Sequence, residues 1–165
     1  MEKAQTRLYS NMKKPRLDEL VELNFSLDEV KIDCQHPNEH YENSKVENLL
    51  SDNPDFGDYD TYYVCKYESW VTVDFKGKEI ELSGFGLKNG TGDHGEDDRY
   101  NPQKVTIYTW SDDDGGKWTE LGEWRLDFNR MQWHSLKYIF NETIEAKKLK
   151  FNFVKNRDDD TNDWL

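Results

Sequence analysis

Apolar and polar residues alternate with a period of two along most of this chain from residue 30 onward. In the stretch SWVTVDF, Val71, Val73 and Phe75 fall on one face of an extended strand and Trp70 and Asp74 on the other, because successive strand side chains point to opposite sides. The alternation recurs at 30–34, 80–87, 105–110, 124–128, 136–140 and 149–154. Short alternating strands separated by turn residues predict an antiparallel β-sandwich or barrel.

Interruptions of this alternation predict how consecutive strands connect. The sequence KGK at 76–78 predicts a tight turn, after which a return strand begins near Ile80. The apolar positions then change phase across Ser83 and Gly84, which is how a β-bulge looks in sequence. Residues 141–148 are predicted to be a connecting segment between the last two strands.

Two short helices are predicted outside the strands. The first covers 15–21, where a proline at the first turn precedes an apolar stripe. The second begins at the capping box SKVE, 44–47, and Pro54 closes the segment. Its apolar stripe consists of Val46, Leu49 and Leu50.

Composition adds constraints on the class of protein. The chain has 165 residues, enough for one domain with its own core. A net charge of -12 and a mean hydropathy of -1.06 are common in disordered chains, but an aromatic content of 14% is not. We therefore expect an aromatic core beneath a charged surface.

The acidic balance argues against nucleic-acid binding and against anionic membranes, since both select lysine and arginine. No segment approaches the roughly 20 apolar residues of a membrane helix, and the N-terminal sequence lacks the apolar core of a signal peptide. These features favour a cytoplasmic protein. The two cysteines, Cys34 and Cys65, fit this expectation, and their spacing leaves open whether they pair.

The segment NGTGDHGEDDRYNP, 89–102, contains a literal G-x-G-x-x-G motif. That motif binds dinucleotides where a strand precedes it and a helix follows, so that the helix N-terminus faces the pyrophosphate. Here acidic residues without a helical period follow the glycines, then Pro102, and clustered carboxylates repel phosphate. We interpret this segment as a recognition loop and not as a phosphate site.

The order of these elements resembles the discoidin, or coagulation-factor C-type, domain of the galactose-binding-like superfamily. The resemblance is carried by the DNPD turn at 52–55 after the capped helix, SWVTVDF at 69–75, VTIY at 105–108 and KWTEL at 117–121. It implies an all-β, antiparallel jelly-roll β-sandwich with one or two short helices. We accordingly expect an N-terminal helical or irregular extension over 1–29 and the sandwich over 30–165. Family members usually end in a further strand with an L-x-E-(I/L) pattern, which we expect this sandwich to lack.

Members of this superfamily bind ligands with loops at one end of the sandwich, so the resemblance implies a site in 35–43, 56–66 and 88–103. The candidate ligand contacts in these loops are His36, Asn38, His40, Tyr41, Tyr59, Tyr62, Tyr63, His94, Asp97, Asp98, Arg99 and Tyr100. Tyrosines beside carboxylates suit sugar and peptide sites, because tyrosine combines apolar area with a polar tip. The alternatives are that the tyrosines cover the core and that the histidines are exposed loop residues without a metal.

No cofactor is expected. The alternative is a structural Ca²⁺ at Asp52 and Asp55, because several superfamily members hold calcium beside this helix and turn, and carboxylate oxygens suit that ion. The sequence has no G-x-S-x-G nucleophile elbow and no local histidine or asparagine motif beside either cysteine. We therefore expect a binding module and not an enzyme.

The polar, acidic character of the predicted loops favours a protein or peptide partner, in particular a basic one, over a membrane surface. Two alternatives stay open. One is a carbohydrate-binding, lectin-like domain that recognises a glycan, and the other is a structural subunit of a larger assembly.

Overall fold

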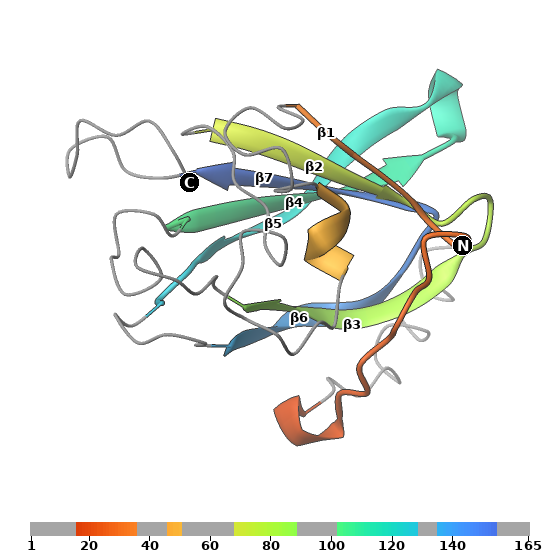
Figure 1. Cartoon of the computed structure of the whole chain (residues 1–165). Helices are drawn as coiled ribbons and strands as arrows, with labels where there is room; N and C mark the ends of the chain where they lie inside the picture. The colour runs from red at the N-terminus through yellow and green to blue at the C-terminus, as the bar shows by residue number, and fades with distance from the viewer. Residues whose placement is uncertain (1–15, 36–45, 51–67, 89–101, 129–134, 155–165) are drawn as a thin grey trace, which may run out of the picture.

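The computed structural model describes residues 16–35, 46–50, 68–88, 102–128 and 135–154 (Figure 1). The elements follow in this order: η1 (Leu17–Glu19), β1 (Lys31–Cys34), η2 (Val46–Leu50), β2 (Glu68–Asp74), β3 (Ile80–Lys88), β4 (Lys104–Ser111), η4 (Asp113–Gly115), β5 (Lys117–Arg125), β6 (Ser135–Ala146) and β7 (Lys148–Val154). Helical structure in these ranges is confined to short 3₁₀ segments.

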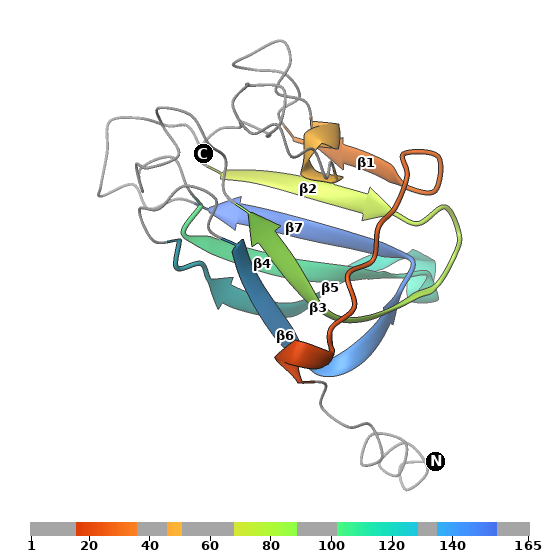
Figure 2. The same cartoon turned by 60° about the horizontal axis from the view of Figure 1, so that its bottom comes forward.

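The strands form two antiparallel sheets that face one another (Figures 1 and 2). The larger sheet has the order β1-β2-β7-β4-β5, and the smaller pairs β3 with β6. The chain therefore changes sheet on leaving β2, β3, β5 and β6. This arrangement confirms the predicted all-β, antiparallel sandwich.

The core lies between the sheets and consists of the inward-facing member of each alternating pair. Val71, Val73 and Phe75 are 2%, 9% and 3% exposed, and both Val105 and Ile107 are fully buried. Burying one such side chain stabilises a fold by roughly 1.5–3 kcal/mol. The period-two pattern of the sequence thus becomes the contact surface of each sheet.

Phe85 of β3 joins the two sheets. Its ring stacks on Tyr138 of β6 with the centroids 5.1 Å apart, and meets Trp124 of β5 and Phe151 of β7 edge-on at 5.3 and 6.2 Å. The Tyr138 hydroxyl also donates a hydrogen bond to the Arg125 carbonyl at 2.9 Å. Each aromatic pair contributes about 0.5–1.5 kcal/mol beyond its buried area, so this cluster fixes the smaller sheet to the larger one.

Several strand predictions are confirmed within one or two residues. β1, β2, β4 and β7 occupy the predicted alternating segments, and the side chains expected to face inward in β2 are buried. The register of β3 and β6 shifts between Leu82 and Gly84, which confirms the predicted β-bulge.

The predicted hairpin between β2 and a return strand is wrong, although its turn forms. Lys76 and Gly77 have φ of 55° and 83°, and the Lys78 amide donates to the Phe75 carbonyl at 3.2 Å. β3 then crosses to the other sheet and pairs with β6. The reason is that β2 already has partners on both edges, β1 and β7.

Two further boundaries differ from the prediction. The segment predicted to connect the last strands, 141–148, is mostly strand, because β6 continues to Ala146 with Ile144 paired to Leu82 beyond the bulge. The strand predicted at 124–128 is the end of β5, which stops at Arg125. The residues that follow remain fixed, since the Leu126 amide donates to the Gln103 carbonyl at 2.8 Å.

The two predicted helices are short 3₁₀ segments of three and five residues. At η1 the chain becomes extended from Leu20, and Val21 is 83% exposed, so the predicted apolar stripe is not buried. In η2, Val46 is buried but Leu49 is 41% exposed. Helix nucleation is costly and short helices depend on tertiary packing, so these brief segments do not develop into α-helices. Ser44 of the predicted capping box lies outside the described residues.

The segment between η1 and β1 passes from the smaller sheet to the edge of the larger one (Figures 1 and 2). Two contacts hold this segment against the turn that follows β2. The rings of Phe25 and Phe75 lie 5.3 Å apart, and the Lys76 ammonium donates to the Asp28 carbonyl at 2.7 Å.

At the same end of the sandwich, Asp112 connects the β4–β5 turn to the corner between β6 and β7. Its carboxylate accepts hydrogen bonds from the Lys147 ammonium and the Trp110 indole N–H, both at 2.9 Å. The bond from Lys147, then that from Trp110, lowers the pKa of Asp112, and Asp112 raises the pKa of Lys147 in return. Trp110 is thereby held in one orientation on the outside of the larger sheet.

The bulge yields a first prediction, because a side chain at Gly84 would collide with the backbone of the paired strand. A Cβ built there meets the Tyr138 carbonyl oxygen, whereas a Cβ at Gly86 meets only the Leu136 oxygen at 3.6 Å and Lys137 Cγ at 3.9 Å. Gly84→Ala should therefore lower the free energy of unfolding by about 1–3 kcal/mol. The matched Gly86→Ala should stay within about 0.5 kcal/mol of the wild type. Urea unfolding measures both, and equal losses would refute the steric explanation.

The Asp112 corner yields a second prediction, on pH. Because the folded state lowers the pKa of Asp112, its bonds persist above the unfolded-state pKa of about 3.9 and are lost as the pH falls through the lower folded value. The NMR resonance of the Trp110 indole N–H should titrate with a midpoint below about 3.9. Lys147→Met should raise that midpoint, while Lys117→Met, at the start of β5, should leave it in place. If Lys147→Met leaves the midpoint unchanged, Lys147 is not what lowers the pKa of Asp112.

Candidate functional site

The three predicted recognition loops attach at one end of the sandwich. The Gln35 amide, directly after β1, donates to the Trp70 carbonyl at 3.0 Å. Glu68 and Lys104, which begin β2 and β4, both pair with Val154. β3 ends on the same side (Figures 1 and 2). The described strand ends therefore bring the attachment points of the loops together.

The candidate ligand residues of these loops lie outside the described residues and stay predictions: His36, Asn38, His40, Tyr41, Tyr59, Tyr62, Tyr63, His94, Asp97, Asp98, Arg99 and Tyr100. The same holds for the predicted calcium ligands Asp52 and Asp55. In the part of the chain that the structure describes, no three histidine, cysteine, aspartate or glutamate side chains are grouped to hold a metal ion. In that part, too, no helix has the length and apolar character to cross a membrane.

A second surface, which the loop prediction does not include, is the outer face of the larger sheet. Strand register brings distant residues into rows there: Lys31 pairs with Asp74, Asp74 with Lys148, and Asp33 with Thr72. We call this surface the outer sheet face. It includes Lys31, Asp33, Thr72, Asp74, Tyr108, Trp110, Trp118, Glu120, Lys148 and Lys150.

Aromatic rings and lysines interleave on the outer sheet face. The indoles of Trp110 and Trp118 meet edge-on with their centroids 5.2 Å apart. The Lys150 ammonium lies 4.6 Å from the Tyr108 ring centroid and 5.0 Å from that of Trp118, and Lys148 lies 5.0 Å from that of Trp110. Each such cation–π contact contributes about 0.5–1 kcal/mol at an exposed site. The rings are therefore held in fixed orientations by their neighbours.

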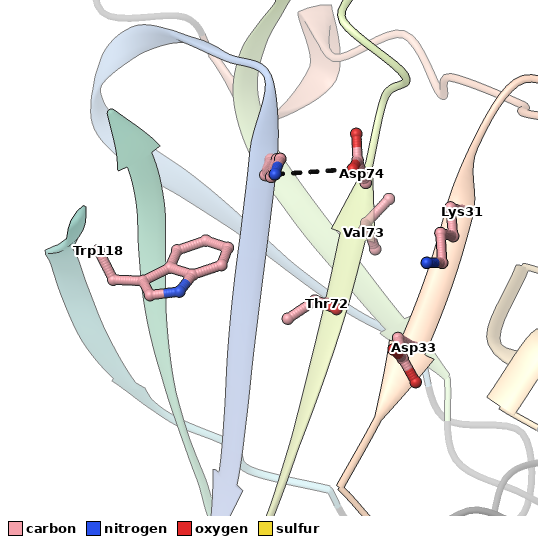
Figure 3. Close-up of a pocket in the computed structure, with 7 residues that line it drawn as sticks. Lys31, Asp33, Thr72, Val73, Asp74 and Trp118 are labelled. Carbon is pink, nitrogen blue, oxygen red and sulfur yellow. Dashed lines mark ion pairs between the residues drawn. The ribbon is translucent and has the colours of Figure 1, made fainter. Parts of the chain in front are cut away.

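A depression of about 150 Å³ lies in the outer sheet face (Figure 3). We call it the sheet-face depression, and its lining residues are Lys31, Asp33, Thr72, Val73, Asp74, Trp118 and Lys148. In Figure 3 the Trp118 indole and the Thr72 side chain extend toward β7 from its two sides. The depression thus draws on β1, β2, β5 and β7.

Both carboxylates of the sheet-face depression are oriented by backbone hydrogen bonds. Asp33 Oδ1 accepts from the Cys34 amide at 2.9 Å, and Asp74 Oδ1 accepts from the Lys76 amide at 2.8 Å. Asp74 Oδ2 also lies 3.8 Å from the Lys148 ammonium. An exposed ion pair of this length contributes little to stability, so its groups are available to a ligand.

The chemistry of the described surface suits binding. The described ranges contain no histidine, and their one cysteine, Cys34, is 6% exposed. A nucleophile activated by an adjacent base, the usual signature of covalent catalysis, is therefore not formed by histidine or cysteine in these ranges. The sheet-face depression instead offers hydrogen-bond donors, hydrogen-bond acceptors and one indole ring.

Sequence reasoning missed the sheet-face depression. The predicted strands place Lys31, Asp33 and Asp74 on their polar faces. Lys148 belongs to the predicted 141–148 connection, and Trp118 lies outside the predicted strands. The available signal was that these positions carry charged or aromatic side chains in several strands, including Lys31, Asp33, Asp74, Trp118 and Lys148. Without the strand order, nothing indicated that they share one surface.

The sequence matches no protein-family model and no curated protein sequence. Solved structures do match. The family 32 carbohydrate-binding module of C. perfringens NanJ, in complex with galactose, superimposes with a TM-score of 0.58 at 12% identity, over 84% of this chain and 88% of that one. The family 32 module of Streptococcus pneumoniae EndoD gives 0.58 at 16% identity, over 82% and 88%.

A fucolectin from the serum of striped bass, Morone saxatilis, gives a TM-score of 0.57 at 16% identity, over 83% of this chain and 44% of that one. Structural likeness at identities this low shows the fold alone, and each superposition covers 82–84% of this chain. This chain therefore has the discoidin, or galactose-binding-like, β-sandwich fold that its sequence resembles.

Proposed function

We propose that this chain is a non-catalytic carbohydrate-binding module. The observation that carries the proposal is its fold: most of the chain superimposes on solved carbohydrate-binding modules, one of them in complex with galactose, and on a fucolectin. A shared fold alone does not determine function, so the chemistry of the site decides what is bound.

Two features of this chain support a sugar ligand. The loop at 56–66 combines several tyrosines with carboxylates, and it attaches at the end of the sandwich where the predicted loops converge. The outer sheet face adds exposed polar groups beside fixed indoles. Sugars present both hydroxyls and apolar C–H faces, so polar groups beside aromatic rings are the complementary surface.

A protein or peptide partner is the second candidate function, and the acidic loops with the net charge of -12 favour it. The matched structures favour the carbohydrate alternative, since they are carbohydrate-binding modules and a lectin. The two functions differ in what abolishes binding. A sugar site depends on ring contacts, whereas a basic peptide depends on the charges of Asp97 and Asp98.

The test is a glycan array followed by calorimetry with galactose and fucose on the full chain. We expect a neutral glycan to bind, and Tyr62→Ala or Tyr63→Ala to weaken it by about tenfold or more, because each truncation removes a ring contact. Lys78→Ala, at the opposite end of the sandwich, is the control and should bind as the wild type does.

Two results would contradict this assignment. If both tyrosine variants bind as the wild type does, the ligand does not use the 56–66 loop. If no glycan binds and a basic peptide does, with affinity lost on Asp97→Asn, the carbohydrate function itself is wrong.

A further inference from the structure

We propose that the sheet-face depression is a second binding site, specific for one ring of a neutral sugar. This inference rests on the proposed carbohydrate-binding function but assigns a place that the loops do not occupy. Asp74, in the depression, lies six residue steps along β2 from Glu68, where a loop attaches, whereas Asp33, the lining residue nearest to a loop along the chain, lies two steps before Gln35. At about 3.3 Å per residue, the depression extends from about 7 to about 20 Å away from the loop attachments.

The charges that line the depression balance, and the neighbouring Lys150, which pairs with Thr72, holds its ammonium over the Tyr108 and Trp118 rings at 4.6 and 5.0 Å. The lining of the depression contains two lysines, Lys31 and Lys148, and two aspartates, Asp33 and Asp74. The two ammonium groups would attract an acidic sugar, but the two carboxylates would repel it. A basic sugar would be attracted by the carboxylates and repelled by the ammonium groups. A neutral ligand avoids both repulsions, so the balance selects against charged glycans.

The alternation of donors and acceptors matches neighbouring sugar hydroxyls. A carboxylate only accepts hydrogen bonds and an ammonium only donates them, whereas a hydroxyl does both. Asp74 lies opposite Lys31 in the strand register and 3.8 Å from Lys148, so acceptor and donors stand side by side. Two adjacent hydroxyls can then each donate to a carboxylate and accept from a lysine. Such charge-assisted bonds are about twice as strong as neutral ones.

Trp118 supplies the apolar side of the site. Its indole lines the depression, while Trp110 packs against its ring and the Lys150 ammonium lies 5.0 Å from its centroid. Asp112 holds Trp110 in turn through the indole N–H. The ring is therefore oriented before a ligand arrives, which lowers the entropy lost on binding. The C–H face of a sugar ring can pack against it.

The volume limits the ligand to a single ring. About 150 Å³ is well below the roughly 300–1,000 Å³ of pockets that enclose drug-sized molecules. A site of this size binds one monosaccharide weakly. A glycan that reaches both the loops and the depression would gain avidity, because the second contact becomes intramolecular.

The experiment compares galactose with galacturonic acid, which differ in the carboxylate at one carbon, by NMR titration of the full chain. Galactose should shift the Trp118 indole N–H and the Thr72 amide, and galacturonic acid should bind there at least about tenfold more weakly. Asp33→Asn keeps the shape of the side chain but removes one charged acceptor. It should lower the affinity for galactose, measured at these resonances, by about tenfold. Glu120→Gln, on the outer sheet face outside the depression, is the matched control and should change nothing.

Three outcomes would overturn the inference, and they separate it from the proposed function. If galactose binds, Tyr62→Ala abolishes that binding and the resonances of Trp118 and Thr72 do not shift, the proposed function holds but the second site is refuted. If galacturonic acid binds at Trp118 more tightly than galactose does, the proposed specificity of the second site for neutral sugars is refuted. If neither sugar shifts any resonance and the glycan array is also silent, the function and the second site both fail.

Discussion

The structure depends on the contact between its two unequal sheets. A two-stranded antiparallel ribbon is at best marginally stable by itself in water, so β3 and β6 need an apolar surface to pack on. Phe85 meets that need, since its ring contacts Tyr138 in its own sheet and Trp124 and Phe151 in the larger one. The close approach at Gly84 serves the same contact, because the bulge changes which residues of β3 face inward.

This contact assigns a role to each face of the larger sheet. Most inward positions of β2, β4 and β7 are apolar and cover the smaller sheet, and Val71, Val105, Ile107 and Phe153 among them are buried, while the inward Ser69 is a buried polar exception. Outward positions do not need to be apolar, and here they carry lysines, aspartates and indoles. Because both faces belong to the same strands, a rigid core also fixes the geometry outside it. Sites built on strands are positioned more accurately than sites on loops.

The sequence predicts the strands better than their partners. β1, β2, β4, β7 and the bulge follow from alternation within one segment, which is a local property. The partner of β3 depends on the edges of β2 being occupied, and the length of β6 depends on pairing beyond the bulge. Both properties depend on segments that are distant in sequence, so the alternation within one strand cannot predict them. The two predicted helices form only short 3₁₀ segments, because a capping or apolar pattern cannot supply the packing that a short helix needs.

The same distinction separates the two candidate sites. The loops could be proposed from a resemblance, because their motifs are continuous in sequence. The sheet-face depression could not, since Lys31 and Lys148 become neighbours of Asp74 only through strand register. Its balanced charge is also hidden by the net charge of -12. Solvent ions screen exposed charges beyond about 8–10 Å, so a ligand responds mainly to the groups nearest to it. A strongly acidic chain can therefore present a neutral sugar site on one sheet and acidic loops at its end.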